Sequence, residues 1–202
     1  KRIFSVISQL KTVAFHKKVI EMCKIKMCNR AFLKKMNENR LLFCCENGVL
    51  DLELGLFRDG RPDDYCTFSC GLNYHSFNEE DEELEELEEL LVKTFPNENR
   101  RQFFTDMASS CLRGGNIHKR FMVGTGPSDG GKSMSFKLLG LVFGEYWGKF
   151  PRELLMVGNN NSSSGARPEL AVVRGKRIMS TQELTHNDRI NIGVLKEITG
   201  ND

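Results

Sequence analysis

The feature that most constrains the fold is an octapeptide, Gly-Pro-Ser-Asp-Gly-Gly-Lys-Ser, at residues 126–133. It fits the pattern G-x-x-x-x-G-K-S at every position. The apolar run Phe121-Met122-Val123 precedes it and predicts a buried strand, and the apolar pattern from Met134 to Phe143 predicts a helix that ends at Gly144. Strand, glycine-rich turn and helix are the setting in which such an octapeptide binds phosphate.

The residue types of the octapeptide suit a nucleoside triphosphate. Glycines let the backbone curl so that several N–H groups face one anion, and the helix N-terminus adds its dipole. Lys132 is expected to reach the β- and γ-phosphates, and the Ser133 hydroxyl is expected to bind Mg²⁺. A glycine-rich surface turn with a chance lysine is the alternative, and the flanking strand and helix disfavour it. The predicted nucleotide contacts are Gly126, Pro127, Ser128, Asp129, Gly130, Gly131, Lys132 and Ser133.

Length and cysteine content limit the number of domains and the redox compartment of the protein. The chain has 202 residues, enough for one large or two small domains, and it begins at Lys1 without a methionine, so we expect it to be part of a longer polypeptide. Seven cysteines, an odd number with no regular spacing, fit a reducing compartment. Cys66, Cys70 and His75 resemble a zinc pattern without a fourth ligand, so ordinary buried cysteines are favoured. No apolar run approaches the roughly 20 residues that span a bilayer.

Charge is strongly segregated along the chain. Residues 1–40 carry eleven Lys and Arg against two acids, whereas residues 79–89 are nearly all Glu and Asp. The apolar periodicity of residues 1–36 predicts helices, whose basic face could contact nucleic-acid phosphates or could simply be solvated. Both interpretations stay open at this point.

The middle of the chain predicts a small β element and two helices. Short strands are expected at 41–45 and 49–52, joined by the turn Asn47-Gly48, with another strand within 65–74. Residues 78–92 predict an acidic helix with a capping box at Asn78 and Asp81, and a further helix is expected to end at Gly114-Gly115. We therefore predict a mixed helical and β domain over 1–115 and a nucleotide-binding domain over 116–202.

A second strand of the nucleotide-binding core is predicted at 177–181, after a possible short helix that opens at Pro151. Glu183 would lie just beyond the carboxyl end of that strand, where nucleotide sites form on such sheets. A carboxylate there can bind Mg²⁺ or orient the attacking water. A lone surface glutamate is the competing interpretation, and the position of Glu183 favours the catalytic one.

Four stretches together resemble the superfamily 3 helicases, and more specifically the poxvirus-type primase-helicase ATPases of large DNA viruses with their plasmid and phage relatives. Residues 47–52 and 62–65 resemble the domain that precedes the ATPase, and 126–133 resembles its Walker A motif. Residues 139–146 resemble the end of its P-loop helix. The last stretch resembles its Walker B region and the start of the next motif, and comprises 168–171, 175–177, Glu183 and 195–202.

The resemblance implies an α/β fold with an AAA+-like P-loop αβα core, truncated at its C-terminus here. It also implies a hexameric ring with ATP between subunits and single-stranded DNA in its channel. The channel hairpin, the sensor asparagine and the arginine finger of the family are expected beyond Asp202. Gly130 stands where the family usually has Asn, and Asn201 stands where it usually has Gly. Neither departure removes a phosphate or metal contact.

The resulting hypothesis is an ATP-dependent DNA helicase subunit that works in viral genome replication. ATP and Mg²⁺ are the expected cofactors, with Lys132 and Glu183 as catalytic residues. The expected partners are single-stranded DNA or a replication fork, other copies of the chain and other replication proteins, without a membrane. The expected location is the replication site of an infected cell. A small-molecule P-loop kinase and an ATP-binding assembly scaffold are the alternatives.

Overall fold

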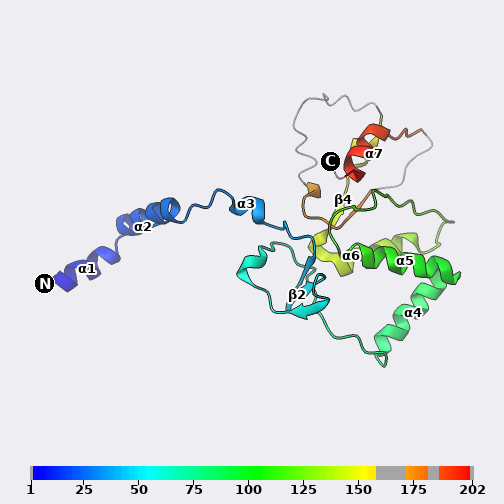
Figure 1. Cartoon of the computed structure of the whole chain (residues 1–202), viewed down its shortest axis with the longest axis horizontal. Helices are drawn as coiled ribbons and strands as arrows, with labels where there is room; N and C mark the ends of the chain where they lie inside the picture. The colour runs from blue at the N-terminus through cyan, green and yellow to red at the C-terminus, as the bar shows by residue number, and fades with distance from the viewer. Residues whose placement is uncertain (1, 158–171, 182–186, 201–202) are drawn as a thin grey trace. The chain divides into compact units, whose positions relative to one another are not determined.

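The computed structural model describes residues 2–157, 172–181 and 187–200, and it is a mixed α/β structure with two small sheets among these residues (Figure 1). The chain divides into two compact units, Lys1–Met36 and Asn37–Asp202. Within the part that the structure describes, no helix is both long and apolar enough to cross a bilayer.

The first unit consists of the helices α1 (Arg2–Leu10), α2 (Val13–Lys26) and α3 (Phe32–Lys35), which confirms the helical prediction for residues 1–36. The Thr12 hydroxyl accepts a hydrogen bond from the Phe15 N–H at 3.3 Å and caps α2. Apolar side chains of this unit are largely exposed, including Phe4 and Ile25. A helix buries its apolar stripe only against a second element, and neither α2 nor α3 has a buried residue.

The second unit begins with an antiparallel sheet in the order β1 (Leu42–Cys45), β2 (Gly48–Asp51) and β3 (Leu56–Arg58). The hairpin predicted around Asn47-Gly48 is confirmed, with Leu42 paired to Asp51. Gly48 is needed at its position because an added Cβ would lie 2.6 Å from the Arg58 carbonyl oxygen.

The strand predicted within 65–74 is wrong, because the third strand of the sheet is β3. Tyr65 and Gly71 have φ of +49° and +74°, which interrupts an extended backbone. The segment still contacts β1 through single hydrogen bonds, from the Cys70 N–H to the Cys44 carbonyl and from the Glu46 N–H to the Leu72 carbonyl, each at 2.9 Å. These bonds attach it to the edge of β1 without a regular ladder.

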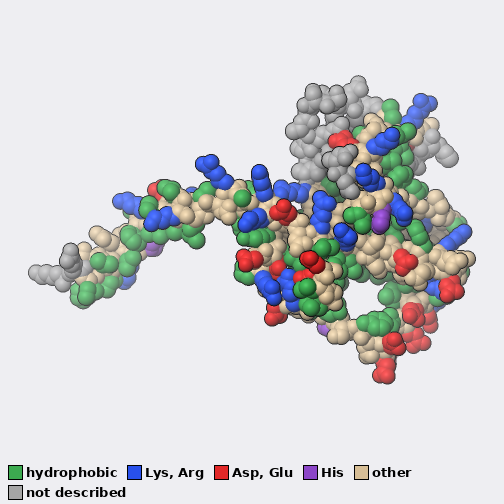
Figure 2. Space-filling view, in the orientation of Figure 1, with side chains coloured by type: hydrophobic (Ala, Val, Ile, Leu, Met, Phe, Trp, Pro, Cys, Tyr) green, Lys and Arg blue, Asp and Glu red, His purple; other side chains and the backbone are tan. Residues whose placement is uncertain are grey.

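The helices α4 (Glu82–Thr94) and α5 (Glu98–Ser110) follow a short 3₁₀ turn, η1 (Pro62–Asp64), and an irregular segment. The rings of Phe95 and Phe104 stack with centroids 4.8 Å apart. The predicted acidic helix is present, and its acidic side chains cover α4 (Figure 2). The predicted capping box is wrong: Asp81 is the N-cap, and the Asn78 amide donates to the Asp81 carboxylate at 2.9 Å. The leucine stripe is only partly covered, since α4 has no buried residue.

The last part of the chain contains α6 (Lys132–Phe143), η2 (Gly144–Tyr146), β4 (Trp147–Lys149), η3 (Arg152–Leu155), β5 (Ile178–Ser180) and α7 (Ile192–Thr199). β4 and β5 form a parallel pair with Trp147 opposite Ile178. The helix predicted after the octapeptide, the short helix predicted after Pro151 and the strand predicted at 177–181 are thereby confirmed.

The strand predicted at Phe121-Met122-Val123 is wrong. These residues are irregular, and their side chains are 54%, 47% and 71% exposed. A strand is held by hydrogen bonds to a neighbour, and none of the strands in the described ranges pairs with this run. The only parallel sheet among the described residues has two strands, so an AAA+-like core stays a prediction.

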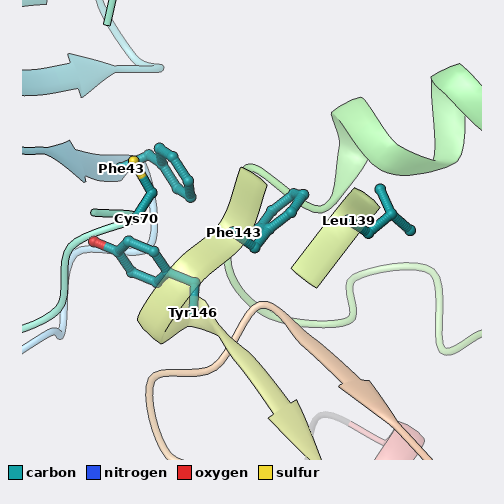
Figure 3. Packing of buried hydrophobic residues seen from close by; sticks show 5 residues of the cluster. All are labelled: Phe43, Cys70, Leu139, Phe143 and Tyr146. Atoms are coloured by element: carbon teal, nitrogen blue, oxygen red, sulfur yellow. The ribbon is translucent and has the colours of Figure 1, made fainter. Parts of the chain in front are cut away.

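The main core lies where the N-terminal sheet meets α6 (Figure 3). Phe143 is 2% exposed, and its ring lies edge-on to Phe43 with centroids 5.6 Å apart. Tyr146 stacks on Phe43 at 4.6 Å, and Cys70 and Leu139 complete the cluster. Residues from both sides of position 115 thus share one core. The domain boundary predicted there stays a prediction.

Candidate functional site

The loop of the octapeptide leads directly into the N-terminus of α6. Gly131 is the N-cap of α6 and has φ of +74°, a left-handed conformation that favours glycine. A Cβ at Gly131 would lie 2.7 Å from the Thr94 methyl carbon. Backbone conformation and crowding by Thr94 therefore both require glycine immediately before Lys132.

The Lys132 ammonium folds back into the loop that precedes it. Its Nζ donates to the Gly126 carbonyl at 2.9 Å and to the Pro127 carbonyl at 2.6 Å. Among the ion pairs of the described residues, none includes Lys132. A cation held only by neutral carbonyls keeps its charge available to an anion that enters the loop.

The N-terminus of α6 offers donors as well as charge. No side chain caps this helix end in the described structure, and the first N–H groups of a helix have no partner within it. The Ser135 hydroxyl donates to the Gly131 carbonyl at 3.1 Å and so ties the end of the loop to the first turn of α6. Ser133 is exposed, so its hydroxyl is accessible to a ligand. Loop glycines, a lysine and an uncapped 12-residue helix fit a phosphate group chemically.

Glu183 lies outside the described residues, three positions after the end of β5. The parallel pairing of β5 with β4 is the part of its predicted setting that the structure contains. The role of Glu183 stays a prediction, as do the roles of the octapeptide residues as ligand contacts. Pro168, Glu169, Leu170 and Ala171 also lie outside the described ranges.

One charged cluster was not identified by sequence reasoning. Arg58 on β3 donates through Nε to Asp51 at 3.0 Å and through both terminal nitrogens to Asp64 at 2.9 Å. All three side chains are at most 14% exposed. The Leu54 N–H and the Arg58 guanidinium hold the pKa of Asp51 below its usual range, and Arg58 does the same for Asp64. The available signal was an acid and an arginine at the ends of short apolar strands, Asp51 and Arg58, followed by an acid in the next turn, Asp64.

The contacts of Tyr146 and Arg177 were not predicted either. The Tyr146 hydroxyl accepts from the Cys44 N–H at 3.1 Å and donates to the Phe68 carbonyl at 3.0 Å. The Arg177 guanidinium donates to the Arg40 carbonyl at 2.7 Å and to the Leu42 carbonyl at 2.6 Å, and it lies over the Tyr146 ring. Burial lowers the pKa of Arg177. These partners are separated by up to 137 positions, so no local sequence pattern indicates them.

The described residues contain no group of three or more His, Cys, Asp or Glu side chains placed to hold a metal ion. The seven cysteines are free thiols. Mg²⁺ bound together with a nucleotide needs few protein ligands, because substrate phosphates and water supply the others. The exposed Ser133 hydroxyl fits that requirement.

Comparison with known proteins gives a consistent set of relatives. A family model described as "D5 N terminal like" matches residues 1–96. Three proteins that share the name "Putative helicase" are similar over most of the chain. The one from Acanthamoeba polyphaga mimivirus is 36% identical over 99% of the chain and the one from Invertebrate iridescent virus 6 is 32% identical over 82%. The one from Invertebrate iridescent virus 3 is 31% identical over 69%.

The chain spans about a fifth or less of each of these relatives: 21%, 17% and 15% of their respective lengths. The match to the family model covers α1 to α4, and the mimivirus and iridescent virus 6 matches extend well beyond it along the chain.

Proposed function

Because the chain belongs to the D5-type primase-helicase family of large DNA viruses, we propose that it is the segment of a viral replicative helicase that binds ATP through residues 126–133. Homologues named as helicases in large DNA viruses support the helicase role. The finer assignment, a P-loop within an AAA+-like core, rests on the octapeptide and on the loop and helix that it forms.

The observation that carries this proposal is the position of Lys132. Its ammonium lies inside a glycine-containing loop, 2.6–2.9 Å from two loop carbonyls, at the uncapped N-terminus of α6. A triphosphate that enters the loop offers Lys132 oppositely charged oxygens in place of neutral carbonyls, which adds the attraction of opposite charges to the hydrogen bond. The position of Lys132 within the loop therefore supports a role in phosphate binding.

The chemical roles follow from the residue types. Backbone N–H groups of the loop and Lys132 bind the phosphates, and the Ser133 hydroxyl is the side chain that would hold Mg²⁺. Mg²⁺ supplies charge neutralisation between the phosphate oxygens. Glu183 would orient the attacking water or bind the metal through water. We further propose that hydrolysis takes place between subunits of a hexameric ring around single-stranded DNA, at a replication fork in an infected cell.

The first unit is the proposed electrostatic contact with DNA. Lys17 and Lys18 are exposed on α2, and Lys34 and Lys35 are exposed on α3. Contacts of this kind are non-specific and weaken steeply as salt is added. Aromatic rings interleaved with basic residues, which would stack bases, are not a feature of the described loop at 126–131.

The test compares two lysines of α6 in the full-length protein that contains this chain. Lys132→Ala is expected to weaken binding of a fluorescent ATP analogue about tenfold to a hundredfold, since a hydrogen bond to a charged group contributes about 1.5–3 kcal/mol. Lys137→Ala removes the same charge from the same helix at an exposed position five residues later, and it is expected to bind as the wild type does.

Equal binding by the two variants would contradict the proposal. ATP turnover measured with and without single-stranded DNA then separates the functional classes. Stimulation by DNA supports a helicase, turnover that depends on a small acceptor supports a kinase, and binding without turnover supports an assembly scaffold.

A further inference from the structure

Four of the seven cysteines gather around the edge of β1. Cys44 and Cys45 are successive residues of this strand, and Cys66 and Cys70 lie on the segment bonded to it. Cys44 and Cys66 pack in one small cluster with Leu42 and Val49. Because successive side chains of a strand point to opposite faces, Cys44 and Cys45 belong to two different groups, and Cys45 packs with Cys70.

The Cys44 and Cys66 pair adjoins solvent. Both cysteines line an open hollow of about 470 Å³, together with Cys45, Arg61 and Asp64. Cys44 itself is 7% exposed, and Cys66 is half-buried. A solute as small as hydrogen peroxide can therefore reach the pair, whereas a protein side chain from a partner has little access to the Cys44 sulfur.

The surroundings of this pair favour a thiolate. The Cys66 side chain packs beside Cys44, and its thiol donates to the Asp64 carbonyl oxygen at 3.6 Å. The neighbouring Cys66 side chain and, to a smaller degree, Tyr146 and the Arg177 guanidinium lower the pKa of Cys44 despite its burial and the nearby Asp64. Cys45 differs in this respect: burial and the neighbouring Cys70 raise the pKa of Cys45 to about 12. A thiolate, not a thiol, is the nucleophile in cysteine oxidation.

We propose that Cys44 and Cys66 form an oxidisable dithiol, a modification site at which a hydroperoxide converts the two thiols to a disulfide. The Cys44 thiolate attacks one peroxide oxygen, the O–O bond breaks, and the leaving hydroxide takes up a proton to give water and a Cys44 sulfenic acid. The Cys66 sulfur then attacks the Cys44 sulfur, and the S–O bond breaks. The departing hydroxide takes the Cys66 proton, so two thiols and one peroxide give one disulfide and two waters.

The test is peptide mass spectrometry of the full-length protein after treatment with hydrogen peroxide and alkylation of the remaining thiols. Trypsin cuts after Arg40 and Arg58, which places Cys44 and Cys45 in one peptide, and it places Cys66 and Cys70 together in another. A Cys45→Ser, Cys70→Ser background leaves one thiol of this group in each peptide. The expected result is a peroxide-dependent peptide pair linked through Cys44 and Cys66, with a matching loss of their alkylation.

Three controls make the result decisive. In Cys66→Ser, the Cys44 sulfenic acid is expected to persist and to be captured by dimedone, whereas Cys44→Ser gives neither linkage nor capture. Cys111 is half-buried, and burial raises its pKa, so it is expected to react little with peroxide and to stay available for alkylation. If the background does not fold, fragmentation of the linked peptides from the unsubstituted protein distinguishes the same pairs.

Linkage of Cys45 to Cys70 in preference to Cys44 and Cys66 would overturn the proposal. So would alkylation of Cys44 that is unchanged by peroxide, or capture at Cys44 that is the same with and without Cys66.

Discussion

The two ends of α6 are built in opposite ways. Its last residue, Phe143, is the most deeply buried side chain described and packs in the main core against the sheet residue Phe43. Its first residue, Lys132, is held by two carbonyls of its own loop, with no capping side chain at that helix end. One helix thus has one end that holds the fold together and another that is available to a ligand.

A parallel contrast separates two cations. Arg58 is enclosed by the carboxylates of Asp51 and Asp64 at 2.9–3.0 Å, so its charge is fully used within the fold. Lys132 has no ion pair among the described residues. A cation paired with buried acids serves stability, whereas a cation held by neutral carbonyls is available for binding. The predictions below test that distinction.

The largest loss of stability is expected from Phe143→Ala. Removing a fully buried aromatic side chain typically lowers the free energy of unfolding by about 3–5 kcal/mol, through lost burial and the cavity left behind. Leu141→Ala is the matched control on the same helix, because Leu141 is 63% exposed. Chemical denaturation measures both variants, and similar losses would contradict the described burial.

Arg58→Met is expected to cause the next largest loss of stability, and to make the free energy of unfolding depend less on pH. Because the pKa values of Asp51 and Asp64 are lowered in the folded state, their contribution is present above the unfolded value of about 3.9 and is lost as pH falls through the folded values. Wild-type stability should therefore fall steeply below about pH 4.

The Arg58→Met variant should be less stable at neutral pH, because two nearly buried carboxylates lose their partner, and its stability should change less on acidification. Lys93→Met is the control, since it breaks the exposed pair of Lys93 with Glu89 and should alter stability little. Thermal unfolding between pH 3 and 7 gives the comparison. An equally steep acid loss in Arg58→Met would show that other carboxylates dominate.

Tyr146→Phe is expected to cost about 1–2 kcal/mol of unfolding free energy. The substitution keeps the ring stacked on Phe43 but leaves the Cys44 N–H and the Phe68 carbonyl without the hydroxyl. Chemical denaturation together with an unchanged far-ultraviolet circular dichroism spectrum would agree with this account. A loss as large as that of Phe143→Ala would instead mean that the ring packing had also changed.

The smallest effect on stability is expected from Lys132→Ala without nucleotide. Two hydrogen bonds from an accessible ammonium to carbonyls are exchanged for bonds to water, so the unfolding midpoint should remain close to that of the wild type. Addition of ATP should then raise the midpoint of the wild type more than that of the variant. A marked loss without ATP would place Lys132 with Arg58 among residues that hold the fold.

Local patterns predicted local structure well. The turn at Asn47-Gly48, the helix after the octapeptide and the strand near residue 178 all follow from short-range spacing, and all are present. The strand predicted at residues 121–123 is absent because apolar content alone does not supply a neighbouring strand for hydrogen bonding. The strand at Leu56-Phe57-Arg58 was not predicted because these three residues form a strand only through pairing with β2.

The parts of the candidate site that depend on contacts between distant residues could not be predicted from the sequence. The octapeptide could be identified from eight consecutive residues, but the crowding of Gly131 by Thr94 joins positions far apart in the chain. The Arg58 cluster and the Cys44 and Cys66 pair likewise depend on how β1, β2 and the segment after β3 come together. Such pairings have no periodic signal in one sequence.

The Arg177 guanidinium carries a consequence for the order of assembly. It joins the carbonyls of Arg40 and Leu42 across 137 and 135 positions of the chain. On a ribosome, the first sheet therefore emerges long before the side chain that completes its edge. Contacts of such long sequence separation are slow to form, because the entropy of closing the loop is lost before the contact stabilises anything. Until then the Arg40 and Leu42 carbonyls are bonded to water, and we expect the protection of this edge from hydrogen exchange to become complete only once residue 177 has emerged.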